Sequence, residues 1–176
     1  GHICLDIIPE WNKGGIKSII PGHTVEMDGT QFSTGGAVAT TGLFLIKLGI
    51  DTQLVGKIGN DEVGSIIKNI LNKQDSNSIK NMIVSEGENS SYTVVLNPPD
   101  TDRIFLHSPG TNHTFQAEDI PFKQIREAKI FHFGYPPLMK KFYTNDGQEM
   151  AKVFKKIGEQ GTVTSLDLAM PDPNSP

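Results

Sequence analysis

Strand-like and helix-like segments alternate along most of this chain, and this alternation limits the folds open to it. Apolar, β-branched runs predict strands, and runs with apolar residues at helical spacing predict helices. The expected strands lie at 3–8, 16–20, 24–27, 53–55, 82–84, 92–96, 103–107, 129–133 and 162–168, and the expected helices at 39–48, 62–71, 117–128 and 145–158. Such an order favours an α/β fold, a mostly parallel sheet with helices on both faces. Ligands of these sheets bind beyond the carboxyl ends of the strands.

Two adjacent glycines, Gly35 and Gly36, stand immediately before the first helical run. Glycine has no side chain, so a ligand can approach the backbone closely. The first N–H groups of a helix have no partner inside it and can donate to a ligand hydroxyl or anion. The same pair also suits an ordinary glycine-rich loop, and two glycines alone do not separate these readings.

The longer spacing resembles the first signature of the ribokinase-like (PfkB) carbohydrate kinases. Gly35, Gly36, Gly49 and Gly59 fall in register with it, and VGKIGNDEVG at 55–64 is similar to the family's VGxVGxDxxG. The resemblance implies a ribokinase-like fold, and it covers nearly all of this chain but only about the first half of the family's.

The resemblance also implies a set of sugar contacts. Asp6, near the end of the first strand, would hold two sugar hydroxyls, and Gly35 and Gly36 would lie beside them. Thr40 stands where the family has Asn; its hydroxyl still donates and accepts, with a shorter reach. Gly134 closes a strand whose end approaches the sugar in the family. The alternative reading of Asp6 is a carboxylate satisfied by nearby backbone N–H groups or by solvent.

A small β-sheet lid over the sugar is implied for two segments, about 10–30 and 92–107. Trp11 either stacks on a sugar face or packs. Arg103 either meets an anionic ligand group or is a solvated charge that guards an edge strand. Asn112 either reaches the substrate or serves a turn. Asp167, near a strand end, is a further candidate.

The activity implied is ATP-dependent transfer of a phosphoryl group to a sugar hydroxyl, with Mg²⁺. The family's Gly-x-Gly-Asp turn, which cradles the phosphate and supplies the base, does not occur in these residues, nor does a GxxxxGK[ST] loop. No catalytic residue is therefore assigned. The chain opens inside a strand pattern and closes on a loop, so we expect it to be truncated: residues 1–176 form the N-terminal part of a longer kinase whose C-terminal nucleotide-binding half is absent.

Other readings remain open at this point: a non-catalytic sugar-binding or regulatory module, a nucleoside kinase, or an unrelated α/β domain. The net charge of −4 and the lack of a basic block argue against nucleic acid as a partner. No apolar run approaches the ~20 residues that a membrane span needs. The five histidines show no metal-ligand spacing. A single cysteine suits a cytoplasmic location, and the resemblance implies a homodimer through the lid.

Overall fold

The computed structural model describes residues 1–77 and 79–170 of this chain. Its strands are β1 (Cys4–Pro9), β2 (Thr30–Gly35), β3 (Lys57–Gly59), β4 (Ile83–Ser85), β5 (Tyr92–Leu96), β6 (Ile104–Ser108), β7 (Ile130–Gly134) and β8 (Val163–Asp167). Its α-helices are α1 (Gly36–Lys47), α2 (Glu62–Gln74), α3 (Phe122–Ile125), α4 (Lys140–Tyr143) and α5 (Gln148–Glu159).

The strands pair mostly in parallel, as the alternation predicts. β1 pairs with β5, β3 with β4, and β7 with β8, all in parallel. The antiparallel partners β2 and β6 complete a four-stranded sheet in the order β2-β1-β5-β6. The His2 N–H donates to the Gly134 carbonyl over 3.4 Å, so the residues that lead into β1 run beside the end of β7.

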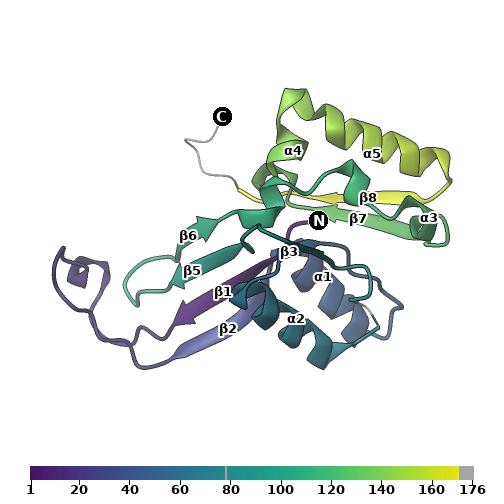
Figure 1. Ribbon diagram of the computed structural model, residues 1–176. Helices are drawn as coiled ribbons and strands as arrows, with labels where there is room; N and C mark the ends of the chain where they lie inside the picture. The colour runs from purple at the N-terminus through teal and green to yellow at the C-terminus, as the bar shows by residue number, and fades with distance from the viewer. Residues whose placement is uncertain (78, 171–176) are drawn as a thin grey trace.

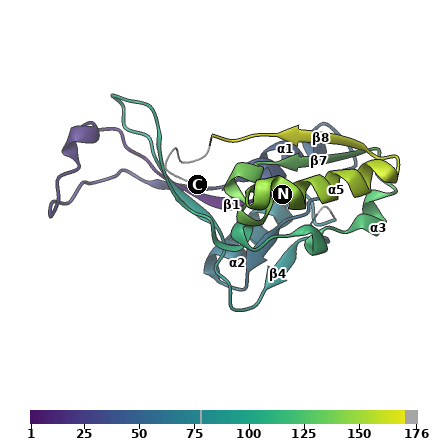
Figure 2. The same ribbon diagram turned by 90° about the horizontal axis from the view of Figure 1, so that it is seen from above.

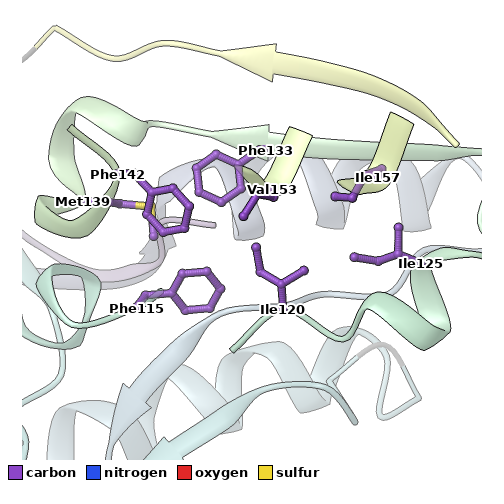
Figure 3. Close-up of a cluster of buried hydrophobic side chains, with 8 residues drawn as sticks. All are labelled: Phe115, Ile120, Ile125, Phe133, Met139, Phe142, Val153 and Ile157. Carbon is purple, nitrogen blue, oxygen red and sulfur yellow. The ribbon is translucent and has the colours of Figure 1, made fainter. Parts of the chain in front are cut away.

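Helices cover both sides of the strands, and two clusters of buried side chains hold them there. Figure 1 shows α4 and α5 on one side of β7 and β8, and α1 and α2 on the other. The cluster under α5 appears in Figure 3 and consists of Phe115, Ile120, Ile125, Phe133, Met139, Phe142, Val153 and Ile157. The second joins β1 and β3 to α1 and α2 and consists of Ile3, Leu5, Ala39, Leu54, Ile58, Ile67 and Leu71.

Part of the four-stranded sheet, together with the loop between β1 and β2, projects from this body. Figures 1 and 2 both show β5, β6 and the loop between β1 and β2 reaching away from the helices. The Ile16 N–H donates to the Asp100 carboxylate over 3.1 Å, so the loop between β1 and β2 contacts the loop between β5 and β6. The two segments expected to form a lid therefore lie together.

The strands predicted at 16–20 and 24–27 are wrong. Residues 16–18 form a single 3₁₀ turn, η1 (Ile16–Ser18), and residues 24–27 lie in no strand or helix. The strands of this region are its flanks, β1 and β2, which pair with each other from Cys4↔Gly35 to Pro9↔Thr30. The residues between them lie beyond the end of that ladder, and Gly14 and Gly22 turn the chain there at positive φ.

Two further predicted elements need correction. The strand expected at 53–55 lies instead at β3, because Ile58 is buried there and residues 57–59 find a parallel partner in β4. The helix expected at 117–128 is interrupted: a 3₁₀ turn, η3 (Ala117–Asp119), is followed by the single turn α3. Pro121 stands between them and has no N–H to continue a helix.

Candidate functional site

A row of polar side chains crosses the four-stranded sheet at Asp6. The register pairs Asp6 with Ser33 on β2 and with Thr93 on β5, and it pairs Thr93 with His107 on β6. Directly paired residues lie on the same face of a sheet, so these four side chains share one face. The Thr93 hydroxyl and His107 Nδ1 are 2.9 Å apart, and the Cys4 thiol donates to Asp6 Oδ1 over 3.4 Å.

The Asp6 carboxylate is half-buried and has no cation beside it in the described part of the chain. Burial raises its pKa, and hydrogen bonds from Cys4 and Thr93 act in the opposite direction. A carboxylate has about four lone-pair sites. Asp6 therefore retains acceptor capacity for hydroxyl groups of a ligand.

The glycine pair fits closely against this row. Gly35 pairs with Cys4, and a Cβ at Gly35 would overlap the Asp6 carboxylate. Gly36 begins α1 with φ +84°, and a Cβ there would collide with the backbone carbonyl and ring of His2. The start of α1 can approach Asp6 and His2 only because both positions are glycine.

Replacing Gly36 by alanine is expected to lower the free energy of unfolding by about 2 kcal/mol, since strain at positive φ adds to the collision with His2. Gly49→Ala is the matched control: Gly49 also has positive φ (+76°), but no atom lies within 4 Å of the place that a Cβ would take there. That control should lose only about 1 kcal/mol. Urea unfolding of both variants of the intact protein measures the difference, and equal losses would contradict the collision.

The end of β7 approaches the same place. Gly134 packs against Ala37 in the first turn of α1. Tyr135 follows it in the left-handed region (φ 63°), which is uncommon for a residue with a side chain. Its N–H donates to the Asp167 carbonyl over 2.9 Å, and its ring centroid lies 5.9 Å from that of His2. Burial, and then the Asp167 charge, raise the pKa of Tyr135.

The other predicted residues lie in different settings. Thr40 is exposed on α1, and its hydroxyl has no hydrogen-bond partner among the described residues. Trp11 is only 5% exposed, and its indole N–H donates to the Lys13 carbonyl, which favours packing over stacking on a ligand. Arg103 is 59% exposed at the far end of β6, next to Asp102, as expected for a solvated edge charge.

Asn112 is a structural residue, and its assignment as a substrate contact needs correction. The side chain is 0% exposed. Its Oδ1 accepts from the Ile3 N–H over 3.2 Å, and its Nδ2 donates to the Ile3 carbonyl over 2.8 Å. The N–H and the carbonyl of Ile3 lie in the extended backbone that leads into β1, and the side-chain amide of Asn112 is the hydrogen-bond partner of both.

Sequence reasoning missed His2, Thr93 and His107. The alternation within 92–96 and 103–107 was visible, but only the register shows that Thr93 and His107 share the face of Asp6. His2 precedes the strand and is 2% exposed, and neither of its ring nitrogens has a hydrogen-bond partner among the described residues. Burial, reinforced by the neighbouring His107, lowers the pKa of His2 to about 3.

This buried histidine predicts a loss of stability in mild acid. In the folded protein His2 stays neutral down to about pH 3, whereas in the unfolded chain it takes up a proton below about pH 6.5. Protonation therefore favours the unfolded state as the pH falls through that window. Between pH 7 and pH 5 the contribution lost is about 2 kcal/mol.

Urea unfolding of the intact protein at both pH values measures this loss. The variant His2→Gln should lose less stability than the wild type by about that amount. The exposed His23 supplies the control, since His23→Gln should retain the wild-type pH dependence. A His2→Gln variant with the wild-type pH dependence would show that His2 does not carry the effect.

The described residues contain neither a metal-ion cluster nor a membrane-spanning helix. Within residues 1–77 and 79–170, no group of three or more His, Cys, Asp or Glu side chains could hold a metal ion. Over the same residues, every helix is too short or too polar to cross a membrane.

Comparison with known proteins identifies the family. The model of the pfkB family carbohydrate kinases matches residues 4–176. "Probable fructokinase-2" of Arabidopsis thaliana is 25% identical over 175 residues, which are 98% of this chain and 50% of that protein. "Probable fructokinase-4" of the same plant is 30% identical over 136 residues, 76% of this chain and 39% of that protein. The chain thus spans about half the length, or less, of these curated relatives.

Solved structures confirm the ribokinase-like fold. A fructokinase with bound ATP from Xylella fastidiosa superposes with a TM-score of 0.75 at 15% identity, over 100% of this chain and 53% of that one. Arabidopsis thaliana ribokinase complexed with ribose and ATP superposes with a TM-score of 0.71 at 19% identity, over 96% of this chain and 52% of that one. Together with the family match, which excludes an unrelated α/β domain, these findings show that the chain belongs to the pfkB family of carbohydrate kinases.

Proposed function

We propose that this chain supplies the sugar-binding and lid half of an ATP-dependent carbohydrate kinase. The observation that carries the proposal is the half-buried Asp6 carboxylate, which has no cation beside it among the described residues and lies against Gly35 at the start of α1. Asp6 accepts hydrogen bonds from two sugar hydroxyls. Gly35 and Gly36 let the sugar approach the backbone, and Thr40, exposed on the same helix, adds a hydroxyl.

The projecting part of the sheet acts as the lid. Its segments are the loop between β1 and β2, about 10–30, and the hairpin of β5 and β6, about 92–107, and both reach away from the body (Figure 1). Closing such a lid would exclude water from the reacting hydroxyl. Gly134, which packs against Ala37 at the start of α1, and Asp167, which pairs with Gly134 at the end of β8, complete the proposed site.

The phosphoryl group would come from ATP with Mg²⁺. The described residues include no metal-ion cluster, and the sequence has neither a Gly-x-Gly-Asp turn nor a P-loop. The nucleotide site and the catalytic base would therefore lie mostly outside residues 1–176, in the remainder of a longer kinase.

A homodimer through the lid is part of the proposal, together with a cytoplasmic location. The face of the four-stranded sheet opposite Asp6 carries a cross-strand row of Phe32, Ile7, Val94 and Leu106. Phe32 and Leu106 are each 53% exposed. An exposed apolar row of this kind supports contact with a second copy.

The experiment is a coupled kinase assay of the intact protein with ATP, Mg²⁺ and a panel of sugars and nucleosides, paired with calorimetric binding of the same compounds. We expect turnover of a sugar, with D-fructose tested first because curated relatives are named fructokinases. Sugar binding without turnover would identify a non-catalytic sugar-binding module. Turnover of nucleosides alone would identify a nucleoside kinase, and binding of none of these compounds would overturn the proposal.

A further inference from the structure

Besides Asp6, the polar row on the sheet contains a second side chain that can hydrogen-bond to a ligand, His107. The residue lies on the edge strand β6 and is exposed, unlike Thr93 and Cys4, which are buried. Its Nδ1 atom is held 2.9 Å from the Thr93 hydroxyl. Its Nε2 atom has no hydrogen-bond partner among the described residues.

The ring of His107 leans toward the site. Its centroid lies 5.3 Å from that of His2, at an interplanar angle of 37°. His2 in turn lies against Gly36, at the start of α1. The His107 ring therefore lies beside His2, which itself contacts the start of α1.

The hydrogen bonds assign a role to each ring nitrogen. The Thr93 hydroxyl donates its one hydrogen toward β1, where Cys4 Sγ lies 3.6 Å away and the Asp6 carboxylate also accepts. With that hydrogen directed to β1, the hydroxyl accepts from His107 and Nδ1 carries the proton; the other tautomer reverses this hydrogen bond. In a neutral imidazole the other nitrogen is an acceptor, which leaves the free Nε2 as an acceptor for an O–H group.

The charges around the row favour an uncharged ligand. Partial desolvation, and then the neighbouring His113, lower the pKa of His107, which favours the neutral ring. The row from Ser33 through Asp6 and Thr93 to His107 contains no lysine or arginine. Arg103 precedes the strand of His107, but its guanidinium lies over Phe105, 5.4 Å from the ring centroid. A carboxylate on the ligand would meet Asp6 with no cation in this row to balance it.

We propose that His107 is a specificity-determining residue whose Nε2 accepts a hydrogen bond from a hydroxyl of an uncharged sugar, with Thr93 as its positioning residue. The inference rests on the proposed function and refines it. The site takes a neutral polyhydroxy sugar and rejects a sugar acid.

The test is isothermal titration calorimetry of the intact protein with D-fructose, D-ribose and 2-keto-3-deoxy-D-gluconate. The wild type should bind one of the neutral sugars at least about tenfold more tightly than the acid. His107→Gln places an amide oxygen near the position of Nε2, so binding should stay within about threefold of wild type. His107→Asn reaches only as far as Nδ1 and should lose about tenfold.

Variants at Thr93 test the positioning role. Thr93→Val keeps the shape but removes the hydroxyl, so sugar affinity should fall by about three- to tenfold, and Thr93→Ser should restore it. Ser108→Ala is the control, because its side chain lies on the opposite face of the same strand as His107. Thermal melts confirm that each variant folds.

The outcomes separate the two proposals. If the wild type binds no sugar, the proposed function fails and this inference fails with it. If the wild type binds a neutral sugar and His107→Asn binds it equally well, the proposed function stands and His107 is not a contact. Tighter binding of the acid than of either neutral sugar overturns the inferred substrate class.

Discussion

Replacing Asp6 by alanine in the intact protein is expected to weaken sugar binding by roughly 30- to 150-fold while nucleotide binding stays nearly unchanged. The carboxylate is half-buried, and only Cys4 and Thr93 donate to it from within the described chain. Hydrogen bonds from two sugar hydroxyls to one carboxylate contribute on the order of 2–3 kcal/mol. Alanine removes both acceptors and leaves the sheet register, which backbone groups set, in place.

Calorimetry with the sugar and with ADP measures both affinities. Asp51→Ala is the matched control, since Asp51 is an exposed aspartate outside the polar row. It should bind sugar as the wild type does. An Asp6→Ala variant that folds and binds the sugar within about threefold of wild type would refute the assignment.

A protein made of residues 1–176 alone is expected not to phosphorylate any sugar at a useful rate. In the proposed function, the chain contributes the sugar-binding residues Asp6, Gly35 and Gly36. It contributes no identified general base and no anion cradle for the transferring phosphate. A positioned base typically supplies about 10²–10⁴-fold in rate, and preorganised donors supply a further large factor.

The same protein should also associate in solution. Ile130 and Val163, paired across β7 and β8, are 61% and 62% exposed. An apolar pair of this kind favours contact with another surface. Kinase assays with ATP, Mg²⁺ and a sugar panel, together with light scattering after size exclusion, test both expectations. Robust turnover would show that the catalytic site lies within these residues, and a stable monomer would mark a self-sufficient module.

The sequence predicted the elements that its periodicity encodes. The helix predicted at 62–71 forms as α2, the strand at 92–96 as β5, and the helix at 145–158 as α5. Each has a hydrophobic pattern that its own packing satisfies: Ile67 and Leu71 are buried in α2, and Val153 and Ile157 in α5. The glycine pair was expected before a helix at 39–48, but α1 begins earlier, at Gly36, so the second glycine is its first residue.

Sequence-based prediction was wrong where strand pairing or a long-range contact, rather than the local hydrophobic pattern, determines the structure. The apolar residues at 16–20 look like a strand, but Ile19 and Ile20 are about half exposed, because the ladder between β1 and β2 ends before them. For Asn112 the sequence left two readings open, a turn residue and a ligand contact. Its amide is taken by Ile3, 109 positions away, a contact that no local pattern encodes.

Only part of the candidate site could be predicted, because strand pairing brings its other residues together. Asp6 stood out because a carboxylate interrupted an apolar strand. Thr93 and His107 did not, because a threonine and a histidine in alternating strands are ordinary. They became candidates only when the register placed them on the face of Asp6.

The most direct test of the account is a crystal structure of the intact protein with its sugar and ADP bound. We predict that two sugar hydroxyls lie about 2.6–3.2 Å from the Asp6 carboxylate oxygens. The sugar should also contact the backbone at Gly35 and Gly36, beneath the projecting sheet. A sugar bound elsewhere, with Asp6 contacting only protein groups, would contradict the account.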